Sequence, residues 1–370
     1  MLIGVPKEIK NHEYRVGLTP SGVKELVKQG HTVMIQRYAG DEIGFSAHHY
    51  IGAGAQIVDS AEEIFARADM IVKVKEPQAC EIAMLRAGQI LFTYLHLAPD
   101  PEQTQGLIKS DCIAIAYETV TDGRGGLPLL APMSEVAGRM SIQAGAHCLE
   151  KAQGGAGILL SGVPGVAPAN VVVLGGGVVG INAARMAMGL GAKVSIFDVS
   201  LNRLKEIDTQ FGPQLTTLYS TTDAIEVALA SADLVIGAVL IPGAAAPKLV
   251  SKQMLKLMKP GSVLVDVAID QGGCFETSHP TTHESPTYVV DNIIHYCVAN
   301  MPGGVARTAT LALTNATMPF VLAIANKGWQ RALNDDIHLR NGLNICQGKV
   351  AYAAVARDLE LDYTPAELLL

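Results

Sequence analysis

Short apolar runs alternate with stretches of helical periodicity along the first third of the chain. A helical pattern begins at Pro20 and ends near Gly30, where a C-terminal capping glycine belongs, and another begins at Pro101. Runs rich in β-branched residues, which predict strands, fall at Leu2–Val5, Thr32–Gln36, Met70–Lys75, Ile90–Leu95 and Cys112–Tyr117. Strands separated by helices of this length predict parallel βαβ units.

A glycine-rich stretch divides the chain. A long helical pattern, Ala131–Ala152, is followed by a loop at Gly154–Gly165, which we expect to lead into a new domain. The buried strand Asn170–Leu174 then opens a second series of strands and helices. The further strands are predicted at Lys193–Phe197, Leu215–Tyr219, Asp233–Val239, Ser262–Val267 and Tyr288–Val290.

The last part of the chain is predominantly helical. The pattern predicts helices from Asn300 to Lys327 and over Gly348–Arg357, and we expect them to pack back on the first domain. The sequence therefore predicts an α/β fold of two doubly wound, Rossmann-like domains with a cleft between them. The first domain would be discontinuous, with residues 1–130 plus 305–370, and the second would span residues 131–304.

Composition narrows the class of protein. A chain of 370 residues suits about two domains, and 49% hydrophobic with 17% charged residues allows sizeable cores. The net charge of −7 argues against a nucleic-acid partner, which selects a basic surface. The apolar stretches Gly157–Ala192 and Leu234–Pro247 are interpreted as buried α/β core, so we expect no membrane span.

The cysteines and histidines predict neither a metal site nor a disulfide framework. None of the six cysteines forms a C-x-x-C pair, so reduced thiols in the cytosol are expected. His279 and His283 are four positions apart, but they lie in a loop rich in proline and threonine that we interpret as structural. The N-terminus shows no charged-then-apolar signal pattern.

A glycine-rich turn carries the strongest chemical signal. Residues Gly175–Gly180 read G-x-G-x-x-G, follow a valine-rich strand and open a predicted helix, Val178–Leu190. Gly175 permits the tight turn, Gly177 has no Cβ to block a pyrophosphate, and Gly180 lets helix and strand pack closely. The phosphates would lie at the helix N-terminus, so the pattern predicts a dinucleotide site. A tight turn without a ligand is the alternative.

The next strand ends at Asp198, 18 positions after Gly180. A carboxylate there can accept hydrogen bonds from the adenosine ribose and would repel a 2′-phosphate, which favours NAD over NADP. Arg203 could instead hold a 2′-phosphate, and Asp198 could be an ordinary helix N-cap. The second domain is accordingly predicted to bind NAD.

Four polar residues follow predicted strands and suit amino-acid or keto-acid chemistry. Arg15 can capture a carboxylate in bidentate fashion, and Lys75 can hold a carboxylate or carbonyl oxygen. His96 is a general acid or base near neutral pH, and Asp270 could support a developing cation. Each also has an ordinary interpretation: a solvated strand-end lysine, a structural histidine, a surface arginine and a turn-capping aspartate. Their joint occurrence beside a dinucleotide fold favours the catalytic interpretation.

Three separated blocks, in the same order, resemble the alanine dehydrogenase and pyridine nucleotide transhydrogenase family. They are Gly4–Glu8 with Asn11–Val16 and Thr19–Pro20, then Pro132–Arg139, then Asn170–Gly180. The resemblance covers essentially the whole chain. It implies cytosolic homohexamers that oxidise L-alanine to pyruvate and ammonium with NAD as cofactor.

The resemblance also implies roles for individual residues. Arg15 and Lys75 match substrate-binding positions, and His96 and Asp270 match the catalytic pair. Beside Gly175, Gly177 and Gly180, the matching cofactor contacts are Ser134, Val178, Val179, Asp198, Arg203, Ser220, Val239, Leu240, Val267, Ala268, Ile269, Val298, Ala299, Asn300 and Met301. No metal is implied.

Other functions stay open at this point. The hydride-carrying subunit of a proton-translocating transhydrogenase would need membrane spans or a partner that supplies them. A saccharopine-type dehydrogenase would need room for a larger substrate. A regulatory protein that binds NAD without catalysis would not need Lys75, His96 and Asp270, whose presence argues against it.

Overall fold

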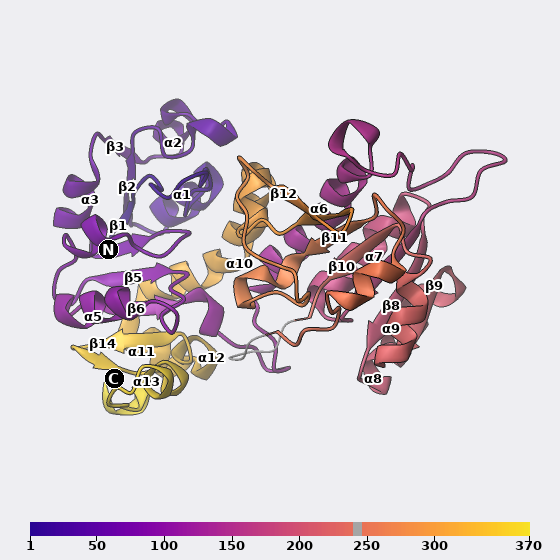
Figure 1. Ribbon diagram of the computed structural model, residues 1–370. Helices are drawn as coiled ribbons and strands as arrows, with labels where there is room; N and C mark the ends of the chain where they lie inside the picture. The colour runs from indigo at the N-terminus through magenta and orange to yellow at the C-terminus, as the bar shows by residue number, and fades with distance from the viewer. Residues whose placement is uncertain (240–245) are drawn as a thin grey trace. The chain divides into compact units, whose positions relative to one another are not determined.

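The computed structural model describes residues 1–239 and 246–370, which form two compact units (Figure 1). Unit 1 consists of Met1–Met133 and Val305–Leu370, and unit 2 of Ser134–Gly304. The first junction therefore lies at 133/134 rather than at the predicted 130/131, inside helix α6 (Ala131–Cys148).

Unit 1 contains a sheet of eight strands in the order β15-β14-β6-β5-β4-β1-β2-β3. The six strands from the N-terminal segment are parallel to one another, whereas β14 is antiparallel to both of its neighbours, β6 and β15. Its strands are β1 (Leu2–Val5), β2 (Thr32–Gln36), β3 (Gln56–Val58), β4 (Met70–Val72), β5 (Ile90–Thr93), β6 (Ile113–Ala116), β14 (Leu343–Cys346) and β15 (Lys349–Val350).

The helices of unit 1 begin and end where local chemistry dictates. The Thr19 side chain accepts a hydrogen bond from the Gly22 amide at the start of α1, and Gly30 follows its end at φ 85°. The helices are α1 (Pro20–Lys28), α2 (Ala47–Gly52), α3 (Ala61–Arg67), α4 (Ala79–Ile82), α5 (Pro101–Ser110), α10 (Ala306–Lys327), α11 (Trp329–Asp335), α12 (Ile337–Arg340) and α13 (Ala353–Asp358).

The C-terminal segment differs from the predicted helix Gly348–Arg357. Gln347 and Gly348 have φ of 51° and 69°, and Cys346 pairs with Lys349, so these two residues turn β14 back into β15. Two-residue hairpins favour such left-handed conformations. Only the later part of the predicted segment is helical, as α13, and strand β14 was not predicted at all.

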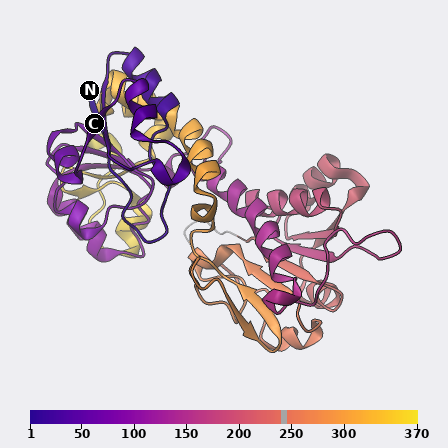
Figure 2. The ribbon, with the colours of Figure 1, turned by 90° about the horizontal axis from the view of Figure 1, so that it is seen from above.

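One helix in unit 1 is long and apolar. The stretch Met301–Lys327, which begins in unit 2 and includes α10, is long and apolar enough to cross a membrane by length and composition, and our expectation of no membrane span stays a prediction. Ala309, Leu313 and Val321 on α10 are buried, and Figure 2 shows α10 as the long gold helix. A core helix meets the same criteria, so this helix is weak evidence for a membrane span.

Unit 2 contains a sheet of seven strands in the order β12-β13-β11-β10-β7-β8-β9. All pairs are parallel except β12 with β13. Read across the sheet from β9 to β13, with β7 as strand 1, the parallel strands follow the doubly wound order 3-2-1-4-5-6, as predicted for a Rossmann-like domain. They are β7 (Asn170–Leu174), β8 (Lys193–Asp198), β9 (Leu215–Tyr219), β10 (Leu234–Gly237), β11 (Val263–Asp266), β12 (Thr287–Val290) and β13 (Ile293–Tyr296).

Strand β13, the sixth strand of the parallel series, was not predicted. Asp291 and Asn292 have φ of 49° and 63° and turn β12 back into β13, so the predicted strand Tyr288–Val290 is only the outer half of a hairpin. Small residues bring helix α7 (Val178–Gly189) close to β7: Ala183, Ala184 and Ala187 are completely buried in the same core cluster as Val171 and Val173. The remaining long helices of unit 2 are α8 (Leu201–Phe211) and α9 (Thr222–Leu229).

Candidate functional site

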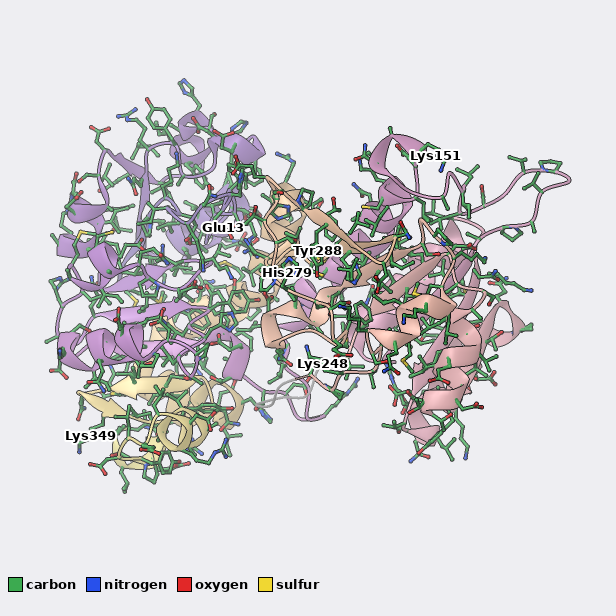
Figure 3. The ribbon with its side chains drawn as sticks, viewed as in Figure 1. Glu13, Lys151, Lys248, His279, Tyr288 and Lys349 are labelled. Carbon is green, nitrogen blue, oxygen red and sulfur yellow. The ribbon has the colours of Figure 1, made fainter. Side chains whose placement is uncertain are left out.

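Arg15 is buried in unit 1, with 3% of its surface exposed, so the surface-loop interpretation is wrong. Its Nε and Nη2 donate to the two carboxylate oxygens of Glu13 at 2.7 and 2.6 Å, and Nη1 lies 3.1 Å from Met133 Sδ (Glu13 is labelled in Figure 3). Burial disfavours the charge, but Glu13 outweighs burial and raises the pKa of Arg15. The guanidinium therefore stays charged although it is buried.

Lys75 lies beyond the end of β4, which stops at Val72 and not at Lys75 as predicted. The segment still runs beside β5, because the Lys73 amide donates to Phe92 O and the Thr93 hydroxyl donates to Lys75 O, at 3.2 and 2.8 Å. The Lys75 side chain is partly exposed, and its Nζ lies 3.9 Å from Glu76 Oε2. An ammonium group thus stands at the end of a firmly held segment.

His96 lies three residues after β5, which ends at Thr93. Its φ is 51°, and its ring stacks on Tyr94 with centroids 5.9 Å apart and planes 9° apart. The His96 amide donates to Glu118 Oε1 at 2.7 Å, and Nδ1 is 4.0 Å from the same oxygen. The imidazole is exposed, so it can exchange protons with solvent or a ligand while a carboxylate holds its backbone.

These three residues lie at one edge of the sheet in unit 1. Strands β1, β4, β5 and β6 are consecutive parallel neighbours, so their carboxyl ends share an edge. Lys75 follows β4 and His96 follows β5. Arg15 reaches the same edge because the chain after it runs against β4: a Cβ placed on Gly17 would lie 2.5 Å from Val72 O.

The carboxylates that hold these residues had no predicted role. Glu13 binds the Arg15 backbone and side chain, Glu118 accepts from the Leu95 and His96 amides, and Glu8 accepts from the Val74 and Lys75 amides. Glu8 and Glu13 stand in the first block of the family resemblance. Acidic residues in the strand-end loops were the available signal, but their partners are distant in sequence.

The glycine turn in unit 2 fits a pyrophosphate. A Cβ on Gly180 would lie 1.8 Å from Gly175 O, and one on Gly175, whose φ is 107°, would lie 2.7 Å from Ala238 O. Those two glycines are needed for the turn itself. A Cβ on Gly177 would meet no atom of residues 1–239 or 246–370 within 4 Å, and Gly177 is the N-cap residue of α7, with no side-chain cap. The open space at this helix N-terminus suits an anion.

Asp198 and Arg203 both hold the Gly176 peptide of this turn. Asp198 Oδ2 accepts from the Gly176 amide at 2.8 Å, and Arg203 Nε donates to Gly176 O at 2.7 Å. The N-cap of α8 is Ser200, so the N-cap interpretation of Asp198 is wrong. Arg203 Nη1 also pairs with Glu206 at 2.6 Å, which engages the guanidinium with a carboxylate of the chain.

Asp270 lies in a short 3₁₀ helix, Val267–Gln271, because β11 ends at Asp266 and not at the predicted Val267. The buried Asp266 carboxylate accepts from the Ala268 and Cys274 amides at 3.2 and 2.9 Å, and burial raises its pKa. Lys248 Nζ donates to Gly272 O and Gly273 O (Lys248 is labelled in Figure 3). The turn bearing Asp270 is therefore held on both sides.

Most other predicted cofactor residues follow the strands of unit 2. They come after β9, β10, β11 and β13, whose carboxyl ends share an edge with those of β7 and β8. These residues are Ser220, Val239, Val267, Ala268, Ile269, Val298, Ala299, Asn300 and Met301. Ser134 lies on α6 instead, and Leu240 lies outside the described residues.

The two histidines four positions apart have structural partners. The His279 ring stacks on Tyr288 with centroids 3.6 Å apart (Figure 3), and His283 Nε2 lies 3.0 Å from Asn300 O. Among residues 1–239 and 246–370, no group of three or more histidine, cysteine or acidic side chains could hold a metal ion.

Comparison with known proteins matches both units. Residues 4–137 match the alanine dehydrogenase/PNT N-terminal domain, and residues 141–353 match the alanine dehydrogenase/PNT C-terminal domain. An alanine dehydrogenase of Halomonas elongata is 63% identical over 370 residues, covering 100% of both chains. One of Bacillus subtilis is 57% identical over 368 residues, covering 99% of this chain and 97% of that protein.

Solved structures agree with these matches. An L-alanine dehydrogenase superposes with a TM-score of 0.95 and 53% identity, covering 97% of this chain and 99% of the other. A transhydrogenase from Sinorhizobium meliloti superposes with a TM-score of 0.82 and 25% identity, covering 96% and 100%. Both family domains match in the expected order, and full-length relatives are more than 50% identical to this chain. The chain therefore belongs to the alanine dehydrogenase/pyridine nucleotide transhydrogenase family.

Proposed function

We propose that the chain catalyses the NAD-dependent oxidative deamination of L-alanine to pyruvate and ammonium, and the reverse reductive amination. The observation that carries this proposal is the shared edge in unit 1 where Arg15, Lys75 and His96 follow or contact neighbouring parallel strands. Two cations and an imidazole suit an α-amino or α-keto acid. The full-length relatives named alanine dehydrogenase support the choice of alanine.

Arg15 and Lys75 would bind the substrate. A charged, buried guanidinium gives strong hydrogen bonds to a carboxylate, and Glu13 fixes its plane by occupying Nε and Nη2. Lys75 would hold a second oxygen, of the carboxylate or of the keto group. The two cations would orient Cα of the substrate so that one face presents its hydrogen.

Unit 2 would bind the nicotinamide cofactor. The space beside Gly177 at the N-terminus of α7 would receive the pyrophosphate, and Asp198 would accept from the adenosine ribose with its remaining lone pairs. The choice of NAD over NADP rests on the Asp198 carboxylate and on the engagement of Arg203 with Gly176 and Glu206. The other predicted contacts at the same sheet edge would surround the remaining parts of the dinucleotide.

Four residues would have distinct roles in the reaction. Bound NAD⁺ supplies the hydride acceptor. The substrate ammonium first loses a proton to solvent. Lys75 and Arg15 hold the carboxylate while hydride leaves Cα, and Asp270 stabilises the positive charge of the resulting iminium. His96 takes a proton from the water that adds to this carbon and returns it to the departing nitrogen, and the proton of the new hydroxyl group converts the released ammonia to ammonium. L-alanine, NAD⁺ and water thereby give pyruvate, ammonium, NADH and a proton.

The proposal also covers the partners, oligomeric state and location of the enzyme. Its partners would be small molecules and further copies of the chain, as a cytosolic homohexamer, with no nucleic-acid or membrane partner. The acidic net charge of −7 supports the absence of a nucleic-acid partner.

The direct experiment is an assay of the purified chain with L-alanine and NAD⁺, following NADH absorbance and pyruvate. We expect alanine-dependent turnover, NADH consumption with pyruvate and ammonium, and weaker activity with NADP⁺. Hydride exchange between NAD(H) and NADP(H) without alanine turnover would favour the transhydrogenase alternative. Dinucleotide binding without any turnover would favour a regulator, and either result would overturn the proposal.

A further inference from the structure

Within the described part of the chain, no backbone carbonyl accepts from the Val74 and Lys75 amides, on the side of the segment that faces β1. Strand β1 pairs with β4 only as far as Gly4 with Ile71, and β1 ends at Val5, before a proline. The following amides, of Val74 and Lys75, donate instead to one carboxylate oxygen, Glu8 Oε1, at 2.7 and 3.3 Å. A side chain thus replaces the missing strand carbonyls.

The opposite side of the same segment is held by backbone and hydroxyl groups. The Tyr94 amide donates to Val74 O at 3.2 Å, and the Tyr117 hydroxyl donates to Lys73 O at 3.0 Å. With the Thr93 hydroxyl on Lys75 O, these bonds fix residues 73–75 against β5 and β6. Glu8 supplies the remaining anchor, on the side where β1 has ended.

Glu8 is itself held by a buried network. Lys73 Nζ donates to Glu8 Oε2 at 3.1 Å and to Glu81 Oε1 at 2.7 Å, and Glu81 Oε2 accepts from the Gln78 amide at 2.8 Å. Glu8, Lys73 and Glu81 are 6%, 0% and 1% exposed. Burial disfavours the Lys73 charge, but the two carboxylates outweigh it and raise the pKa of Lys73. The ion pair with Lys73 therefore holds the buried Glu8 carboxylate in place beside the Val74 and Lys75 amides.

We propose that Glu8 is a positioning residue that aims Lys75 at the substrate, by anchoring the Val74 and Lys75 amides through Oε1. This inference rests on the proposed function, in which Lys75 binds the substrate. Glu8 would not touch substrate or cofactor. Its loss would let the end of the β4 segment shift, and a misplacement of about 1 Å in a substrate-holding group can cost on the order of 100-fold in rate.

Three variants separate positioning from folding. Glu8→Ala removes the anchor, and we expect KM for L-alanine and pyruvate to rise about 10-fold or more, with kcat/KM falling accordingly. Glu8→Gln keeps a carbonyl oxygen for both amides but places an amide NH₂ opposite Lys73, so the midpoint of thermal unfolding should fall while KM stays near the wild-type value. Lys73→Met removes the ammonium that holds Glu8 Oε2 but leaves Oε1 to accept from both amides, so the midpoint should fall while KM rises less than in Glu8→Ala.

The outcomes decide the inference even if one variant folds poorly. If the rise in KM is proportional to the fall in the unfolding midpoint across all three variants, Glu8 has only a structural role. Glu8→Asp keeps the charge but withdraws the acceptor by one methylene, and an unchanged KM there would also overturn the inference. NADH binding, a property of unit 2, should be unchanged throughout.

Hydrogen exchange distinguishes this inference from the proposed function. A wild-type chain without alanine turnover would refute the function, whereas the anchor can still be measured at the peptide that contains Val74 and Lys75. We expect faster amide exchange there in Glu8→Ala and slow exchange in Glu8→Gln. Equal protection in wild type and Glu8→Ala would refute the anchor itself.

Discussion

Two glycines of the same turn should respond oppositely to a single methyl group. Gly177 has φ −71° and ψ −167°, a conformation open to alanine, and a Cβ there meets no heavy atom of the described residues within 4 Å. Gly177→Ala should therefore cost the fold only about 1 kcal/mol, the usual loss when alanine replaces a good N-cap. The added methyl would occupy the space that we assign to the pyrophosphate.

The effect on binding follows from that placement. Overpacking by one methyl typically costs about 1–3 kcal/mol, which corresponds to roughly a 5- to 150-fold weaker Kd for NADH. In Gly180→Ala the same methyl would lie 1.8 Å from Gly175 O. That contact would push helix α7 away from strand β7, so Gly180→Ala should lower the free energy of unfolding by at least about 1–3 kcal/mol. For a unit of this size, each kcal/mol lowers the midpoint of thermal unfolding by about 2–4 °C.

Two measurements test the pair. NADH fluorescence titration gives Kd, and thermal unfolding without ligand gives the midpoint. Gly177→Ala should weaken NADH binding and lower the midpoint by only about 2–4 °C, whereas Gly180→Ala should lower the midpoint further. An unchanged Kd in Gly177→Ala would refute the assignment of the pyrophosphate, and an unchanged midpoint in Gly180→Ala would refute the packing argument.

Three further predictions concern single side chains. His96→Ala should abolish nearly all turnover and leave the Kd for NADH within about 2-fold, because His96 lies in unit 1; equal losses of both would count against its role. Asp198→Gly should relax the preference for NAD over NADP and also weaken binding of both, because Asp198 holds the Gly176 amide; an unchanged ratio of the two kcat/KM values would exclude Asp198 from the ribose. Burial lowers the pKa of His295 from its ordinary 6.5, so the unfolded chain binds the proton more readily and the free energy of unfolding should fall as pH drops below about 6.5. In urea titrations, His295→Gln should reduce the dependence of the free energy of unfolding on pH. An unchanged dependence would contradict the assignment of this effect to His295.

Local patterns predicted most of the fold. Asn170–Leu174 and Leu215–Tyr219 are strands with the predicted bounds, because a buried parallel strand is a short apolar run between turn residues. Strands β3, β13, β14 and β15 were missed. Strand β3 is a three-residue edge strand with little pattern of its own, whereas the other three belong to hairpins whose two turn residues adopt positive φ. Asp291–Asn292 was the local sign of the hairpin that contains β13.

The candidate site was only partly predictable, for a different reason. Residues that follow strands, such as Lys75 and His96, can be found from the strand pattern alone, because parallel strands bring their ends together. The groups that fix them depend on contacts between distant residues: Glu8 meets Lys73 across 65 positions, and Glu118 meets the His96 amide across 22. The pattern of apolar and polar residues does not predict contacts between residues so far apart in the sequence. They can be identified only when the order of the strands is known.

The most direct measurement is the fate of the hydrogen on Cα of the substrate. The chain is given L-alanine deuterated at Cα with NAD⁺, and the reduced cofactor and the keto acid are analysed by mass spectrometry. One deuterium in each NADH, with an equal amount of pyruvate, is the predicted result. Unlabelled NADH, or NADH without pyruvate, would contradict direct hydride transfer from alanine.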